Sequence, residues 1–392
     1  MQAFFKTHKY LLEHLDVPMR RELMDEIDWN HRLIGIKGAR GVGKTTFLLD
    51  YAKSAFGQDK ACLYINLNNL YFTGRTIVSF ADEFRKTGGK TLILDQVYKY
   101  PNWSEELKYC YDHFDDLHII FSGSPVMRLK GENPDLKDRA EAYTLEGFSF
   151  REYLNLENNI SLRKYSLEEI QQNHVEICQE IINEVKPLAY FTDYLHHGYY
   201  PFFQEKSNYL ENLLKTINLV LEIDISYLLQ IELKYLPKLR KLLYLVAKSA
   251  PFQPNVSKLS AEVETSRATI MNYLNYLKQG KLINLLYEEN EDAMKKPSLI
   301  YLQNPNLVYS VFHGDVDSRL LNCTFFYNQV GVKHQVNFCR KGDFCVDGDL
   351  VYHVGGRYVD EVPKGEKGYY TRDMIEVGKD RQIPLWLYGF LY

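Results

Sequence analysis

Eight consecutive residues near the amino-terminal end carry the clearest signal in this chain: Gly38-Ala39-Arg40-Gly41-Val42-Gly43-Lys44-Thr45. They match the pattern G-x-x-x-x-G-K-[ST] at every fixed position. A short apolar run ending at Ile36 precedes them, and apolar residues then recur at helical spacing from Lys44 to Gly57. The sequence therefore predicts a strand, a loop and a helix, an arrangement in which backbone N–H groups surround a phosphate.

This loop predicts a nucleotide site that needs a metal ion. We expect the nucleotide to be bound by Gly38, Ala39, Arg40, Gly41, Val42, Gly43, Lys44, Thr45 and Thr46. Lys44 would reach the β and γ phosphates, and the Thr45 hydroxyl would be a Mg²⁺ ligand. A second metal anchor is expected at Asp95, which ends the apolar run Leu92-Ile93-Leu94. ATP and Mg²⁺ are therefore the expected cofactors.

The residue after Asp95 changes the expected chemistry. P-loop ATPases of the additional-strand class usually have a glutamate here, which takes a proton from the attacking water, but this chain has Gln96. An amide cannot act as a general base at neutral pH, although it can still hold a water by hydrogen bonds. We therefore predict an ATPase that binds ATP but hydrolyses it orders of magnitude more slowly than an ATPase with glutamate at this position.

Apolar runs flank the loop in a regular order. Strand candidates at 61–67, 91–95 and 118–121 alternate with helical stretches, which predicts a parallel sheet covered on both faces. Ser122 and Ser124 follow the last run, at the edge of a parallel sheet where ligands lie. Either hydroxyl could sense the γ-phosphate, and capping of the following helix is the alternative role.

Composition narrows the class of protein. A length of 392 residues predicts two or three folded units at about 150 residues each. With 47 basic and 51 acidic side chains the net charge is −4, so contact with nucleic acid or anionic membrane needs a local patch. No stretch approaches the roughly 18 apolar residues of a membrane span. Six scattered cysteines without a CxxC pair favour a reducing compartment, and we expect a cytoplasmic protein with no membrane partner.

The second half begins as helical sequence, from 160 to about 290. Residues 234–258 are rich in Lys and Arg and contain no acidic residue. Residues 259–277 read as two helices about a short turn, and a wing starts at Gly280, which predicts a winged helix-turn-helix. Arg267, Lys278 and the basic stretch could contact DNA phosphates, whereas a protein-interaction or packing role is the alternative.

Past residue 297 the pattern becomes strand-like. The strand candidates are 299–302, 344–346, 350–352 and 384–388. We expect a third unit there.

These residues together resemble a known family, the bacterial and archaeal AAA-type ATPases that pair a P-loop domain with a carboxyl-terminal domain of unknown function. The resemblance is carried by residues 35–46, 94–103, 122–124, 145–154, 194–201 and 383–388. The strings Lys-Tyr-Pro-Asn-Trp at 99–103 and Ser-Phe-Arg-Glu-Tyr-Leu at 149–154 are its most specific parts. It implies an α/β fold with an AAA-type P-loop NTPase parallel sheet. A helical and winged-helix region and a small α/β nuclease-like domain would follow.

The resemblance also assigns two site residues. The family has a glutamate at the position of Gln96, which puts hydrolysis in doubt, and it carries an arginine that maps onto Arg139. Such a guanidinium would reach the γ-phosphate of a neighbouring subunit, so a homo-oligomer is expected, with a ring as one form. A surface role is the alternative for Arg139, and Arg128 or Arg151 could take the finger role instead. The residues expected in catalytic roles are Gln96, Arg139 and Ser122.

The last unit resembles a degenerate restriction-endonuclease-like fold. A working nuclease of this type needs an Asp and a Glu-x-Lys on adjacent strands to hold Mg²⁺. The chain offers Asp343 or Asp347, but it has His353 and Arg357 where Glu and Lys would stand. We therefore expect an inactive relic used for shape or nucleic-acid docking.

The expected division is 1–155 for the P-loop domain, 156–232 for a helical lid-like region, 233–296 for the winged helix and 297–392 for the nuclease-like domain. The leading function is an ATPase that couples its Mg-ATP state to the carboxyl-terminal domains. The alternative is a nucleic-acid-binding adaptor in which nucleotide only sets conformation. Metal-dependent DNA cleavage is the least expected function.

Overall fold

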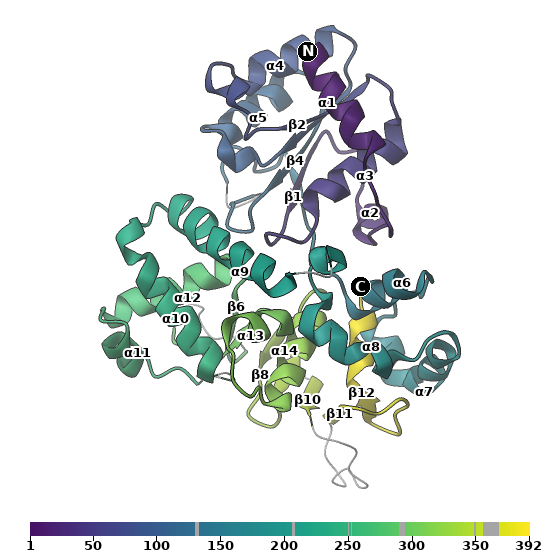
Figure 1. Cartoon of the computed structure of the whole chain (residues 1–392), viewed down its shortest axis with the longest axis vertical. Helices are drawn as coiled ribbons and strands as arrows, with labels where there is room; N and C mark the ends of the chain where they lie inside the picture. The colour runs from purple at the N-terminus through teal and green to yellow at the C-terminus, as the bar shows by residue number, and fades with distance from the viewer. Residues whose placement is uncertain are drawn as a thin grey trace. The chain divides into compact units, whose positions relative to one another are not determined.

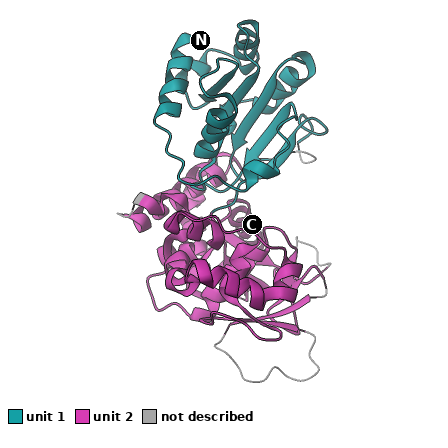
Figure 2. Cartoon of the chain, turned by 90° about the vertical axis from the view of Figure 1, so that its right-hand side faces the viewer, with its two compact units in different colours: residues 1–147 teal, residues 148–392 magenta. Residues whose placement is uncertain are grey.

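The computed structural model describes residues 1–129, 133–205, 208–249, 251, 253–289, 295–348, 350–355 and 368–392. The chain forms two compact units, residues 1–147 and residues 148–392 (Figure 2). The finer division into four domains stays a prediction.

The first unit is built on a five-stranded parallel sheet. Its strands are β1 (Leu33–Lys37), β2 (Cys62–Asn66), β3 (Thr91–Asp95), β4 (His118–Gly123) and β5 (Glu141–Thr144). Their order is β2-β3-β4-β1-β5, and every pairing is parallel. The first four strands confirm the sequence prediction of a parallel sheet. The sequence does not reveal β5, because its four residues are only half-buried and form no apolar run.

Helices cover both faces of this sheet. They are α1 (Gln2–Glu13), α2 (Leu23–Glu26), α3 (Lys44–Phe56), α4 (Ile77–Lys86) and α5 (Trp103–His113). α1 and α3 lie on one side of the sheet, and α4 and α5 lie on the other (Figure 1). β3 is buried along its whole length, as expected for a strand covered on both faces.

The strand order brings three loops together. β4 lies between β1 and β3, so the carboxyl ends of these three parallel strands meet at one edge of the sheet. Ligands of open α/β sheets bind at this edge.

The second unit begins with helices. They are α6 (Phe150–Asn158), α7 (Leu167–Glu184), α8 (Pro187–Asp193), α9 (Tyr209–Leu219) and α10 (Leu236–Ser249), with π-helical segments at Tyr194–Gly198 and Val220–Tyr227. α6 and α7 each start with a capping box in which a serine and a glutamate three residues later bond each other's backbone. The helical character expected for this region is confirmed.

Two short helices and a hairpin follow. α11 (Val256–Glu262) and α12 (Arg267–Gln279) are joined by a short turn, and β6 (Ile283–Leu286) pairs antiparallel with β7 (Leu299–Leu302). Ile270 and Leu274 of α12 are buried, as expected. The sequence pattern predicts β7 as part of the last unit, but its strand partner is β6, which packs on α12, while β7 itself packs on α10 and α13.

The carboxyl-terminal part is an α/β layer. Its strands are β8 (Val336–Phe338), β9 (Phe344–Val346), β10 (Leu350–Val354), β11 (Gly368–Arg372) and β12 (Gln382–Pro384), and its helices are α13 (Pro305–Val311) and α14 (Ser318–Val330). The sheet order is β12-β11-β10-β9-β8. The pairings from β8 to β10 are antiparallel, and those from β10 to β12 are parallel.

Two expectations for this part are wrong. The predicted strand at 384–388 is a 3-10 helix, Leu385–Phe390, whose residues are all buried. The strand-like reading also misses α13 and α14. The 3-10 helix and α14 are buried on nearly all sides. Their sequences therefore have no polar face that would reveal the period of a helix.

Two further features concern the cysteines and the apolar character of the helices. Cys339, which directly follows β8, and Cys345, the middle residue of β9, form a disulfide, whereas the other four cysteines are free and buried. Among the helices that the structure describes, none has the length and apolar character needed to cross a bilayer.

Candidate nucleotide-binding site

The loop between β1 and α3 depends on its glycines. Gly41 and Gly43 have φ values of 89° and 93°, a region that residues with a side chain rarely adopt. A Cβ on Gly38 would lie 2.2 Å from the carbonyl oxygen of Leu145, so that position has no room for one. The loop is thus a tight backbone turn, and α3 begins directly after it at Lys44 with its amino-terminal end towards the loop.

Side chains hold the loop from both sides. Lys44 Nζ donates to the carbonyl oxygens of Gly38 and Ala39, at 2.7 and 2.8 Å. Arg21 donates from Nη1 to the Val42 carbonyl oxygen at 3.2 Å and from Nη2 to the Glu146 carbonyl oxygen at 2.8 Å. The ammonium of Lys44 is therefore positioned inside the turn. Arg21 is not predictable as a site residue, because its partners Val42 and Glu146 are far from it in the sequence.

Asp95 is the centre of the site. Its side chain is buried, and four donors reach its two oxygens. Thr45 Oγ1 and the Tyr64 hydroxyl each donate to Oδ2 at 2.7 Å. Ser122 Oγ donates to Oδ1, and so does the Gln96 backbone N–H at 3.0 Å. A buried carboxylate is tolerable when it is hydrogen-bonded in this way.

The contact between Thr45 and Asp95 fits a magnesium site. A hydroxyl and a carboxylate are hard oxygen ligands, which Mg²⁺ prefers, and a Mg²⁺ ion keeps waters and binds phosphate oxygens besides one or two protein groups. No cluster of three His, Cys, Asp or Glu side chains suited to a metal occurs among the described residues. The two oxygens would therefore hold the ion together with a bound triphosphate, and they would not form a closed protein cage.

Tyr64 is a second site residue that the sequence does not reveal. It lies in β2, next to β3 in the sheet, and 6% of its surface is exposed. Burial, together with the negative charge of Asp95, raises the pKa of Tyr64 well above its ordinary value, so its hydroxyl stays a donor. In the sequence it is one more apolar position in a strand. Only the pairing of β2 with β3 places it beside Asp95.

Gln96 follows β3 in a strained conformation. Its φ of 57° lies in the left-handed region, which costs about 1–3 kcal/mol for a residue other than glycine. Its backbone N–H also lies 3.2 Å from Ser122 Oγ. Within the described part of the chain, the carboxamide of its half-buried side chain makes no hydrogen bond. The structure thus places Gln96 beside Asp95, and within the described residues its side-chain amide has no partner.

The two serine candidates differ in their bonding. The Ser122 hydroxyl is committed to Asp95. Ser124 is 2% exposed, and among the described residues its hydroxyl has no hydrogen-bond partner. Of the two, Ser124 therefore has the hydroxyl that is available to another group, and Ser122 acts on Asp95.

The arginine candidates are placed in different settings. Arg139 makes a bidentate contact with Asp112, from Nε at 2.8 Å and from Nη2 at 3.1 Å. This bond is the main reason why the pKa of Asp112 is lowered. Arg151 is buried in the second unit and donates from Nε to the Tyr392 carbonyl oxygen at 3.0 Å, whereas Arg128 is exposed. A finger role for Arg139 would require release from Asp112.

The candidate nuclease residues are tied to other side chains. Arg319 Nη2 donates to Asp343 Oδ1 at 2.7 Å, and Val354 N–H donates to Asp343 Oδ2 at 2.7 Å. Asp347 contacts His334 Nδ1 at 2.6 Å. A guanidinium thus lies where a nuclease of this type would bind a cation. Arg357 lies outside the described residues.

Comparison with known families agrees with this geometry. Residues 30–154 match the family model described as AAA domain. Residues 30–154 form an AAA-type P-loop domain. Residues 188–302 match a domain of unknown function, DUF8612. The resemblance inferred from the sequence, a P-loop domain joined to a domain of unknown function, is confirmed, and so is the P-loop NTPase fold.

Individual relatives are distant. The uncharacterized protein MJ1637 of Methanocaldococcus jannaschii is 27% identical over 293 residues, which cover 70% of this chain and 61% of that protein. Two solved structures, AMPPCP-bound DnaA from Aquifex aeolicus and a DNA replication initiation factor, are 16% and 14% identical. Each match covers 70% of this chain and 92% of the other, with a TM-score of 0.27. PCH-2 of C. elegans is 16% identical, with 44% and 46% covered and a TM-score of 0.24.

Proposed function

We propose that this chain binds Mg-ATP in the loop at 38–46 and passes the nucleotide state to its second unit. The contact of Thr45 with Asp95 beside the glycine turn carries the proposal, because it joins the two expected metal anchors. In the bound state Lys44 would exchange the carbonyls of Gly38 and Ala39 for the β and γ phosphates. Bound Mg²⁺ would neutralise charge on the phosphate oxygens.

Gln96 makes hydrolysis slow in this proposal. Its amide can orient a water, but it cannot accept the proton that the water loses on attack. A positioned general base contributes about 10²- to 10⁴-fold to such a step. The chain would therefore stay in its ATP-bound form for long periods.

Two variants test this function on the full chain. Isothermal titration calorimetry with ATP and Mg²⁺ should detect binding to the wild type, and Lys44→Ala should weaken it at least about tenfold, since a charge-assisted contact is worth about 1.5–3 kcal/mol. Lys53→Ala, which removes an exposed lysine of the same helix, is the matched control and should bind normally. Gln96→Glu should raise turnover by about 10²-fold or more. Absence of binding heat for the wild type would refute the proposal.

The proposal extends to subunits. In a homo-oligomer, ring-shaped or otherwise, Arg139 would leave Asp112 and reach the γ-phosphate bound by a neighbour. The Asp112 carboxylate is charged at neutral pH and bonds Arg139 through both oxygens, so Asp112 competes for the guanidinium. Arg139 would therefore leave Asp112 only if assembly placed it beside an anion of higher charge, such as the bound triphosphate.

A nucleic-acid-binding adaptor is the second candidate function. The observation that favours it is the sequence of α11, a short turn, α12 and the β6–β7 hairpin, which is the arrangement of a winged helix. In this proposal residues 233–296 form the winged helix and residues 297–392 form the nuclease-like relic. Nucleotide would then only set the conformation of the chain.

A further inference from the structure

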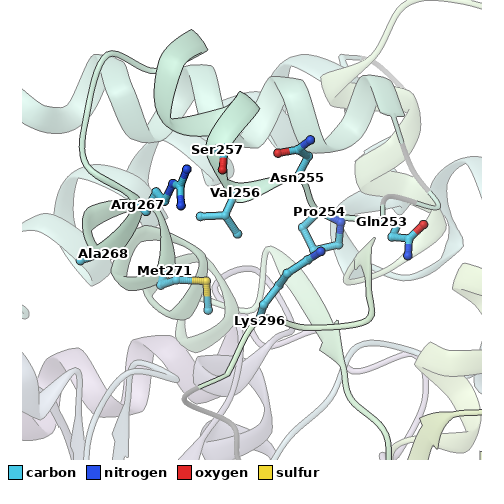
Figure 3. A pocket seen from close by; sticks show the side chains of 9 residues that line it. All are labelled: Gln253, Pro254, Asn255, Val256, Ser257, Arg267, Ala268, Met271 and Lys296. Carbon is cyan, nitrogen blue, oxygen red and sulfur yellow. The ribbon is translucent and has the colours of Figure 1, made fainter.

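The second unit contains a cavity of about 680 Å³ where α11 and α12 begin (Figure 3). Residues 253–257 form one wall, and Arg267, Ala268 and Met271 of α12 form another. Lys296, which precedes β7, completes the lining. Figure 3 shows Arg267 and Met271 on one side of the cavity and Lys296 with Pro254 on the other.

The charges in this cavity have one sign. Arg267 and Lys296 are both exposed, and its lining includes no acidic side chain. Neither cation has an acidic partner among the residues that the structure describes. The other polar groups of the lining, on Gln253, Asn255 and Ser257, are neutral. Two unneutralised cations facing a shared space favour an anionic ligand.

The basic stretch at 234–258 is different, although it dominates the sequence. Lys234 lies 2.7 Å from Glu232, and Arg240 lies 2.7 Å from Glu222. Lys258 lies 3.9 Å from Glu262. These acids come from outside the stretch, so the sequence alone does not show the pairing. Much of the apparent positive charge is thus neutralised within the chain.

The helix geometry adds to the charge. α12 has 13 residues and begins at Arg267, so its positive end lies at the cavity. Ser266 accepts the Thr269 N–H as an amino-terminal cap. In helix-turn-helix modules, the first residues of the second helix face the DNA, and phosphates set its register.

We propose that this cavity binds the phosphate backbone of duplex DNA through Arg267 and Lys296, and that Lys234 and Arg240 take no part. The inference rests on the adaptor function proposed above and is independent of the ATP site. In this proposal Arg267 of α12 and Lys296, which precedes β7, bind the phosphates of the same stretch of DNA backbone.

The test is a titration of the full chain with a fluorescently labelled duplex at several salt concentrations. Each phosphate contact contributes about 0.9 to the slope of log affinity against log salt. Arg267→Ala and Lys296→Ala should each reduce this slope by about 1, and the double variant by about 2. The matched control, Lys234→Ala with Arg240→Ala, also removes two basic side chains and should keep the wild-type slope. Thermal melting and calorimetric ATP binding check that each variant is folded.

The possible results distinguish a failure of this inference from a failure of the adaptor function on which it rests. If the wild type binds no duplex at low salt, the adaptor function and this inference both fail. If the wild type binds but the Arg267 and Lys296 double variant keeps its slope, or the control loses as much, only the inference fails. Tighter binding of a poly-glutamate peptide than of duplex at equal salt would also overturn it, because the site would then favour an acidic protein.

Discussion

At the scale of single residues, the bonds of Asp95 show how the chain fixes the carboxylate that we propose as a metal anchor. Four donors from four different positions hold its carboxylate, and only Thr45, Ser122 and Gln96 belong to motifs that sequence reasoning can find. Tyr64 supplies the fourth bond from the neighbouring strand. Such outer partners orient a ligand, and their loss typically lowers metal affinity about 10- to 100-fold.

We therefore expect Tyr64→Phe to act on the metal more than on the nucleotide. The Mg²⁺ concentration that gives half-maximal ATP binding should rise about tenfold or more, because Asp95 loses an orienting bond. Binding of metal-free ATP, measured in a chelator, should stay unchanged. Calorimetric titrations at a series of Mg²⁺ concentrations measure both quantities.

Tyr100→Phe is the control for this prediction. Tyr100 is also a buried tyrosine of the first unit, and its hydroxyl donates to Glu106 at 2.7 Å. It should lose a comparable bond without changing the Mg²⁺ requirement. Equal Mg²⁺ responses of the two variants would mean that Tyr64 only stabilises the fold.

At the scale of elements, α6 explains the most specific string in the sequence. Ser149 caps the helix and also donates to the Tyr392 carbonyl oxygen at 2.8 Å, while Glu152 closes the capping box. Arg151 bonds the same carbonyl oxygen, and Phe150 packs edge to face against Phe191. The string Ser-Phe-Arg-Glu thus joins two distant parts of the second unit. Arg151 is buried and bonded in this contact, which argues against a finger role for it.

This joint predicts unequal effects of two similar substitutions. Ser149→Ala removes a buried cap and one of the two donors to the Tyr392 main-chain oxygen, which keeps its bond from Arg151, so it should lower the free energy of unfolding by about 2–3 kcal/mol. Ser166→Ala removes the cap of α7, which is exposed, and should cost only about 1 kcal/mol. Urea denaturation followed by circular dichroism compares them. Similar losses would contradict the role of Ser149 at the Tyr392 contact.

Local sequence predicted the elements whose signal lies in one contiguous stretch. The glycine loop and the strand ending at Asp95 were predictable because their signals are contiguous. β5 was not, because its residues are half-buried, and neither was α14, because it is buried nearly all round. Tyr64 and the ion pairs of Lys234 and Arg240 depend on partners that only the fold brings near.

At the scale of the whole molecule, the two units carry the two proposed ligands. The loop at 38–46 lies in the unit of residues 1–147, and the cavity beside Arg267 lies in the unit of residues 148–392. If nucleotide state is passed between them, the two binding events must share a coupling free energy. That coupling is reciprocal by thermodynamic necessity.

We therefore expect ATP to change the affinity of the full chain for duplex DNA, and DNA to change the affinity for ATP by the same factor. Typical couplings of about 1–3 kcal/mol correspond to about 5- to 150-fold. With the slow hydrolysis proposed for Gln96, the measurement can be made with ATP itself, because the nucleotide would stay intact during a titration. Lys44→Ala should remove the response to ATP while leaving DNA binding without nucleotide unchanged. If both ligands bind and neither alters the other, the units act independently, and the transmission of nucleotide state is refuted although each site stands.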